Sequence, residues 1–231
     1  MSSQIEYYNR FGREFKEQIL SCPEPHLWTT DYAAKGRVYQ EMKQRIAQQE
    51  NLVEQYFTSQ QPVLDVGCGF GRQAYALAQK GFSVTGTDTS QVFIEIVEEL
   101  FRKHNLAGTF LCTDVTHDQT IPPFNQLLLL DVLEHIPPKS RKNFMQRIAA
   151  LTNSKGRLIV SLPHVKKRVT SQLNNLLRKR VTQYFSFFRN KEEHPYPIPQ
   201  YNEMIKLTQE HFSLLKKQTT ALTDYYVLEK R

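Results

Sequence analysis

The chain has 231 residues, 40% of them hydrophobic, and a formal net charge of +7, a composition that fits one soluble globular protein. No uninterrupted apolar stretch approaches the roughly 20 residues that span a bilayer, and the polar opening residues include an acid, unlike a secretory signal, so we expect cytoplasmic residence. The three cysteines are odd in number and far apart, which argues against a disulfide framework and a zinc knuckle.

Residues 1–60 show helical spacing without alternating strands. Apolar residues recur at helical intervals from Ile5 to Ile19 and again from Val38 to Tyr56. We therefore expect two helices that form a cap on the domain made by residues 61–231. Trp28 lies between these helices in a proline-containing loop, where a lone Trp is either a packing anchor or a substrate contact.

The most informative local pattern is a glycine-rich turn, Asp65-Val66-Gly67-Cys68-Gly69-Phe70-Gly71-Arg72. It follows the apolar pair Val63-Leu64 and leads into a helical pattern, which predicts a strand, a tight turn and a helix. Glycines at alternate positions let the backbone bend sharply and let a ligand lie against bare peptide. The next helix then directs its free N–H groups at that ligand. The turn lacks the Lys-Ser/Thr of a P-loop and differs from the G-x-G-x-x-G dinucleotide pattern.

Strand and helix patterns alternate after this turn. We expect helices over 72–80, 91–104 and 137–151, and strands over 82–87, 108–112, 127–130 and 156–162. This alternation predicts a doubly wound α/β sheet. A helix over 201–210 and two strands over 212–220 and 225–229 complete the chain, and the two strands are expected to pair as an antiparallel hairpin at the sheet edge.

An acidic residue follows each of four predicted strands: Asp65, Asp88, Asp114 and Asp131. Because ligands of such sheets bind at the carboxyl ends of the strands, we expect these residues at one rim. Asp88 follows Asp65 in the chain at close to the roughly 20-residue offset at which an acid meets ribose hydroxyls in related folds. Alone, each acid is equally well explained as a solvated loop residue or a helix cap.

The glycine turn resembles motif I of the class I S-adenosylmethionine (SAM) methyltransferases, and the resemblance extends over residues 61–162 and, more weakly, the hairpin. It implies a seven-stranded Rossmann-like sheet and SAM as the cofactor, with NAD as the main alternative for the loop. Asp65 would orient the ammonium group of SAM, Asp88 would accept from the ribose hydroxyls and Asp114 from the adenine amine. The implied cofactor-binding residues are Asp65, Gly67, Cys68, Gly69, Gly71, Asp88, Thr89, Asp114, Val115 and Asp131.

The segment Asp131-Val132-Leu133-Glu134-His135-Ile136-Pro137 resembles one common in small-molecule methyltransferases, including quinone-biosynthesis O-methyltransferases. Three interpretations stay open. His135, with Glu134, is a catalytic candidate that removes a proton from the methyl acceptor. Alternatively, Asp131, Glu134, His135 and His164 bind a divalent metal such as magnesium, as a similar segment does in small-RNA 2′-O-methyltransferases. In the third, Glu134 and His135 only cap a helix and hold the strand end.

Residues 164–199 form an insertion at the place where this family builds a substrate lid. Its part from Lys166 to Lys191 contains eight basic residues and no acid, and apolar residues recur at helical spacing from Val169 to Phe188. A basic amphipathic helix of this kind suits contact with an anionic membrane or a lid over an acidic or lipophilic substrate. A packed helix with a solvated cationic face explains it equally well.

A stiff proline-rich stretch, 192–199, follows this helix. It carries His194 and Tyr196, which join His164 and Trp28 as candidate substrate contacts. A rigid loop without such contacts is the simpler interpretation of the stretch.

The sequence thus predicts a methyltransferase acting on a small molecule, most simply at a hydroxyl oxygen. An RNA methyltransferase with a metal-assisted site, and a non-catalytic SAM-binding protein, are the alternatives. DNA is not expected as a partner, and membrane association beside cytoplasmic residence stays open.

Overall fold

The computed structural model describes residues 2–164 and 196–231. Within these residues one sheet has seven strands in the order β3-β2-β1-β4-β5-β7-β6. Strand β7 runs antiparallel to both of its neighbours, β5 and β6, and the other pairs are parallel. The predicted Rossmann-like sheet with a C-terminal antiparallel hairpin is therefore confirmed. The strands are β1 (Val63–Val66), β2 (Val84–Asp88), β3 (Thr109–Cys112), β4 (Phe124–Leu130), β5 (Thr152–Pro163), β6 (Phe212–Thr219) and β7 (Thr223–Lys230).

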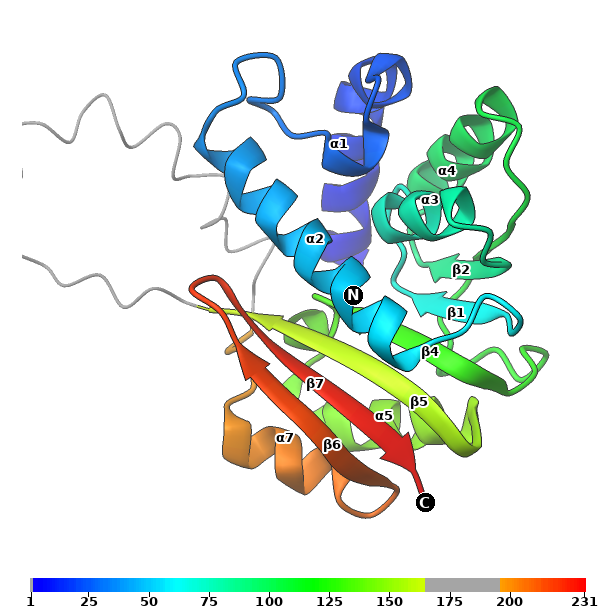
Figure 1. Cartoon of the computed structure of the whole chain (residues 1–231), viewed down its shortest axis with the longest axis vertical. Coiled ribbons are helices and arrows are strands. Elements are labelled where there is room, and N and C mark those ends of the chain that lie inside the picture. Colours follow the sequence, from blue (N-terminus) through cyan, green and yellow to red (C-terminus); the bar gives the residue numbers. More distant parts are fainter. Residues whose placement is uncertain (1, 165–195) are drawn as a thin grey trace, which may run out of the picture.

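Helices cover both faces of this sheet (Figure 1). One layer contains α1 (Ser2–Ser21), α2 (Arg37–Tyr56), α3 (Arg72–Gln79) and α4 (Gln91–Lys103), and its side chains form the first core cluster. The opposite layer contains α5 (Arg141–Ala150) and α7 (Tyr201–Thr208), which form the second cluster. Short 3₁₀ turns lie at η1 (Pro25–Leu27), η2 (Leu133–His135) and η3 (Pro138–Ser140).

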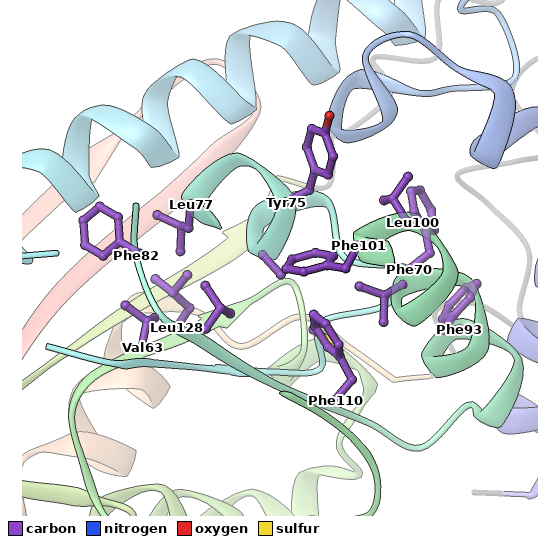
Figure 2. Close-up of a cluster of buried hydrophobic side chains, with 14 of the residues drawn as sticks. Val63, Phe70, Tyr75, Leu77, Phe82, Phe93, Leu100, Phe101, Phe110 and Leu128 are labelled. Atoms are coloured by element: carbon purple, nitrogen blue, oxygen red, sulfur yellow. The ribbon is translucent and has the colours of Figure 1, made fainter. Parts of the chain in front are cut away.

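The central strands are buried on both faces because their side chains alternate between the two layers. Val63 of β1 and Leu128 of β4 pack with α3 and α4, whereas Leu64 and Leu127 pack with the opposite layer. Figure 2 shows the first of these layers, where Val63 and Leu128 lie near Leu77. The continuous apolar run at 127–130 is thus a central parallel strand, as its length and composition predict.

Strand β4 begins three residues before the predicted strand. The prediction missed this part because it contains a polar residue, and the hydropathy pattern does not show that this residue is buried. Gln126 is only 3% exposed. Its Oε1 accepts a hydrogen bond from the Thr58 N–H at 2.5 Å, and its Nε2 donates to the Thr58 and Gln61 carbonyls at 3.0 Å. The amide thus pairs with backbone groups of the loop before β1, which removes the cost of burying it.

The helices of residues 2–56 lie over the carboxyl edge of the sheet near β1 and β4 (Figure 1). The start of α2 is fixed by Asp31, whose two carboxylate oxygens accept from the N–H groups of Val38 and Tyr39 at 2.9 Å each. Helix α1 is tied to the start of α4, where the Ser90 hydroxyl donates to the Asn9 side chain at 2.7 Å. These contacts place both helices against the rim that carries the predicted acids.

None of the helices within residues 2–164 and 196–231 has the length and hydropathy of a membrane span.

The predicted insertion over 164–199 falls outside the described residues except for His164 and 196–199. The basic segment 166–191 and His194 therefore stay predictions.

Candidate active site

Two adjoining cavities open at the carboxyl edge of the sheet. The larger has a volume of about 580 Å³ and the smaller about 280 Å³. The larger cavity extends along the ends of β2 and β3, and the smaller one lies between the ends of β1 and β4 and the helices α1 and α2. Six residues line both cavities and mark their junction: Tyr8, Gly67, Gly69, Phe93, Asp131 and His135.

The glycine turn forms the floor of this junction. The N–H groups of Gly67 and Cys68 both donate to the Thr87 carbonyl, at 2.8 and 2.9 Å, so the turn is fixed to the end of β2. Gly67 has φ +73°, and a Cβ there would lie 2.5 Å from a Val132 methyl group. Gly67 and Gly69 therefore leave bare backbone facing the cavities, as the sequence predicts. Burial raises the pKa of the Cys68 thiol, which favours its neutral form.

Gly71 has a packing role beside the one that the resemblance implies, and it lines neither cavity. Its φ is +88°, and a Cβ on it would lie 2.2 Å from Cγ2 of Val97 in α4. The third glycine of the turn thus allows α3 and α4 to pack closely. Its assignment to cofactor contact stays a prediction.

Gly71→Ala is therefore expected to lower the free energy of unfolding by about 2 to 4 kcal/mol, from backbone strain and the clash with Val97 together. Urea unfolding measures this change. Gly81→Ala is the matched control, because Gly81 has φ +82° but nothing within 4 Å of the added Cβ. Only backbone strain remains there, at about 1 kcal/mol. Equal losses in the two variants would contradict the packing role of Gly71.

Asp88 lies at the end of β2 and faces the larger cavity, beside Thr89. Its Oδ2 accepts from the Gly69 N–H at 2.9 Å and its Oδ1 from the Ser90 N–H at 2.8 Å. Burial raises the pKa of Asp88, and these backbone hydrogen bonds oppose the rise. The carboxylate is thereby held in one orientation, and each oxygen keeps a lone pair for a hydroxyl of a ligand.

Asp114 and Val115 lie beyond β3 at the far end of the larger cavity. Oδ1 of Asp114 accepts from the Thr116 N–H and hydroxyl at 2.9 and 2.7 Å, which leaves Oδ2 for a ligand. Arg147 of α5 donates to the carbonyls of Val115 and Asp118, at 2.9 and 2.6 Å, and so fixes the loop. The end of the cavity thus combines a carboxylate acceptor with the buried apolar side chain of Val115.

Asp65 and Gln73 are buried polar residues in the wall of the smaller cavity, each at most 4% exposed. Burial, helped by the charge of Asp88, raises the pKa of Asp65 to about 7. Within the part of the chain that the structure describes, Oδ2 of Asp65 and both amide atoms of Gln73 have no hydrogen-bond partner. Buried polar atoms are normally paired, so these atoms indicate a ligand with its own donors and acceptors.

Arg72 adds positive charge to the same wall. Its guanidinium donates to the His26 carbonyl at 3.3 Å and lies 4.5 Å from the centre of the Phe70 ring. Burial, together with the charge of Arg45, lowers the pKa of Arg72 to about 9. A partly buried cation without a carboxylate partner among the described residues favours an anionic group in the cavity.

His135 occupies the junction of the cavities from the 3₁₀ turn η2. Two residues of α1 contact its ring: the Tyr8 hydroxyl lies 3.4 Å from Nε2, and the Gln4 amide nitrogen lies 3.3 Å from Nδ1. The Tyr8 and His135 rings meet edge to face. Glu134, fully buried, lines the smaller cavity beside it. The imidazole is thus oriented by the N-terminal helix and faces both cavities.

Asp131 connects the end of β4 to the helices above it. Its backbone is left-handed, with φ +55°, and its N–H and Oδ1 both bond the Ser161 hydroxyl of β5, at 3.0 and 2.9 Å. Its Oδ2 forms an ion pair with Arg45 of α2. Aspartate is one of the non-glycine residues that adopt this conformation most readily, and the contacts with Ser161 and Arg45 hold it there.

The four candidate metal ligands do not gather into one site. His164 lines neither cavity and instead pairs with Asp224 of β7, with 3.1 Å between Nε2 and Oδ1, while Asp131 is paired with Arg45. Across residues 2–164 and 196–231, no group of three or more His, Cys, Asp or Glu side chains is placed to hold a metal ion. The predicted metal interpretation therefore gains no support from the geometry, and His164 is not a cavity contact.

Of the remaining candidate substrate contacts, Trp28 lies in a cavity wall and Tyr196 does not. Trp28 is buried against Phe11, Phe15 and Phe70 and also lines the smaller cavity, so it is both a packing anchor and part of the wall. Tyr196 lines neither cavity, and His194 lies outside the described residues.

The strand order, the glycine turn after β1 and the acids after β2 and β3 define a class I methyltransferase fold. Residues 63–156 match the sequence profile of the family described as "Methyltransferase domain". Over 171 residues the chain is 29% identical to a ubiquinone biosynthesis O-methyltransferase of Coxiella burnetii (strain Dugway 5J108-111), a match that covers 68% of this chain and 69% of that protein. Residues 63–156 thus resemble a methyltransferase domain, and the chain has the fold of the class I SAM-dependent methyltransferases.

Two solved structures share the fold at low identity. The magnesium protoporphyrin IX methyltransferase of Synechocystis PCC 6803, solved with bound SAM, is 18% identical with a TM-score of 0.68, covering 98% of this chain and 94% of that one. The N-methyltransferase NodS of Bradyrhizobium japonicum WM9, solved with S-adenosylhomocysteine, is 13% identical with a TM-score of 0.60, covering 95% and 98%. Because their names specify different acceptors, the shared fold does not identify the acceptor of this chain.

Proposed function

We propose that this protein transfers the methyl group of SAM to a hydroxyl oxygen of a small molecule, with His135 as the proton acceptor. The observation that carries the proposal is the position of His135, whose oriented imidazole faces both cavities at their junction. A cofactor that extends from the larger cavity into the smaller one would meet, beside this ring, an acceptor held in the rest of the smaller cavity.

The cofactor fits the polar atoms of the site. Asp88 would accept from the ribose hydroxyls and Oδ2 of Asp114 from the adenine amine. The unpaired Oδ2 of Asp65 would accept from the ammonium group, while Gln73 and Arg72 would bind the carboxylate. When bound, SAM supplies an already activated methyl group. The protein's task is then to place the acceptor in line and to remove its proton.

The acceptor would occupy the part of the smaller cavity that the two N-terminal helices cover. Its wall there is mainly aromatic and aliphatic, with Tyr7, Phe11, Val38, Met42 and Ile46. Such a wall suits a compact, largely apolar molecule, and the hydroxyl to be methylated would face His135. The name of the Coxiella burnetii relative supports a small-molecule oxygen as the acceptor. Cytoplasmic residence stays a prediction from the sequence.

Turnover assays test this proposal directly. SAM binding is first measured by calorimetry, and methyl transfer from labelled SAM is then compared between a panel of phenols and bulk tRNA. We expect binding of SAM and transfer to a phenol that persists in a strong chelator. Transfer to tRNA alone would establish the RNA alternative instead, and binding without transfer to any acceptor would favour a non-catalytic SAM-binding protein. Activity lost with the chelator and restored by magnesium would reinstate a metal.

A further inference from the structure

Arg141, the first residue of α5, is a charged side chain that the fold buries almost completely, at 1% exposure. It lines neither cavity. Arginine is seldom buried unless its guanidinium is fully engaged. The partners of Arg141 therefore indicate what its burial achieves.

The guanidinium of Arg141 binds three separate segments of the chain. Its Nε donates to the Ile136 carbonyl at 3.0 Å, its Nη1 donates to Glu203 of α7 at 2.7 Å, and its Nη2 donates to the Pro197 carbonyl. Because the guanidinium is a planar, rigid fork, it fixes the relative positions of these three acceptors. A lysine ammonium, a single point charge on a flexible stem, would not reproduce that geometry.

One of these acceptors belongs to the loop that carries His135. Ile136 follows His135 directly and lines the larger cavity with Pro137. The backbone hydrogen bonds described within this loop each close a single turn, such as that from the Ile136 N–H to the Leu133 carbonyl, and Pro137 and Pro138 have no N–H to donate. The contact with Arg141 thus holds the loop from outside the cavity.

We propose that Arg141 is a positioning residue for methyl transfer: it holds the loop of His135 in register with Pro197 and α7. This inference rests on the proposed function, because His135 is the proton acceptor there. Removing the fork would let the imidazole shift relative to the cavity junction, and displacements of about 1 Å are enough to cost a reaction about 100-fold.

A neighbouring ion pair supplies a matched control. Lys142 and Glu210 are 3.0 Å apart and also connect α5 to the end of α7, but both side chains are about half exposed or more. Lys142→Met therefore removes an ion pair from the same region without touching the loop of His135. A difference in kcat between variants at Arg141 and at Lys142 then distinguishes the effect of the buried guanidinium from the effect of losing any ion pair beside α7.

The experiment compares Arg141→Lys, Glu203→Gln and Lys142→Met by kinetics and by NMR of the histidine rings. The His135 signal is assigned by its absence in His135→Asn. We expect Arg141→Lys to lower kcat by about 10- to 100-fold, with the KM for SAM changed by less than about threefold, and to displace the His135 signal. Glu203→Gln should give a smaller change in the same direction, and Lys142→Met none.

An unchanged kcat and an unchanged His135 signal in Arg141→Lys would overturn the inference. Should Arg141→Lys not fold, Glu203→Gln decides, because it keeps an acceptor for Nη1 at a partly exposed position. The His135 signal does not require turnover. If no acceptor is methylated, a displaced signal still supports positioning by Arg141, so failure of the proposed function and failure of this inference remain distinguishable.

Discussion

His135→Ala is expected to lower kcat by about 10²- to 10⁴-fold while leaving the affinity for SAM within about threefold. The imidazole is the group at the cavity junction that Tyr8 and Gln4 orient, so its removal takes the proton acceptor from the site. The polar groups proposed to bind SAM, Asp65, Asp88 and Asp114, lie at the ends of other strands. This variant should therefore lose methyl transfer while it keeps its affinity for SAM.

The measurement is single-turnover methyl transfer to the best acceptor, with SAM affinity by calorimetry on the same sample. His117→Ala is the matched control, because His117 lines only the larger cavity, near Asp114. It should leave kcat within about twofold. Full turnover by His135→Ala with SAM bound would eliminate the proton-acceptor interpretation and leave the segment with a structural role.

Most of the fold follows from short-range patterns in the sequence. The buried residues of the 127–130 run require helices on both faces of the sheet. The acids at the end of β2 and beyond β3 reach one rim because parallel strands end at the same edge. These features are encoded by spacing alone. Asp88 and Asp114 were therefore predictable at the larger cavity.

Contacts across the cavities were not predictable in the same way. Gln4 and His135 are 131 residues apart, and Arg45 meets Asp131 from the middle of α2. A polar residue on an amphipathic helix is indistinguishable by pattern from one on a solvated face. Only the docking of α1 and α2 on the rim makes these residues part of the site.

Gly71 and His164 show a second limit. The three glycines of the turn look alike in sequence, and the position of Val97 in α4 decides that Gly71 serves packing. His164 follows β5 as Asp131 follows β4, yet its side chain binds Asp224 because β7 is inserted beside β5. The position of a residue after a strand predicts that it lies at the carboxyl edge of the sheet, but not the direction in which its side chain points.

Asp65→Asn is expected to weaken SAM binding by about 10- to 100-fold at pH 8, because a charge-assisted hydrogen bond to the ammonium group is worth roughly 1.5–3 kcal/mol. The same variant should raise the melting temperature of the ligand-free protein at that pH. Both effects come from one buried carboxyl, whose pKa burial raises from the ordinary 3.8 to about 7.

The sign of the stability effect follows from proton linkage. Between about pH 4 and pH 7 the folded protein keeps the proton on Asp65, while the unfolded chain has released it. The contribution of Asp65 to stability therefore falls as the pH rises across this window, and above it the folded state holds a buried charge. Asparagine never ionises, so the variant escapes this loss. Thermal unfolding at about pH 5 and about pH 8 measures the difference.

In the wild type, SAM binding should favour the ionised form of Asp65, which burial disfavours in the ligand-free protein. A cationic ammonium beside Asp65 favours the carboxylate, so binding releases a proton and affinity rises with pH, by up to about tenfold per unit below pH 7. Calorimetry in two buffers of different ionisation enthalpy counts that proton. Asp224→Asn is the control: Asp224 lies outside both cavities, and hydrogen bonds from Thr219 and His164 hold its pKa low against the effect of burial. If SAM binding by Asp65→Asn has the same pH dependence as in the wild type, the ammonium group lies elsewhere. If that pH dependence is lost and the ligand-free variant is more stable, Asp65 lowers the stability of the protein and strengthens cofactor binding.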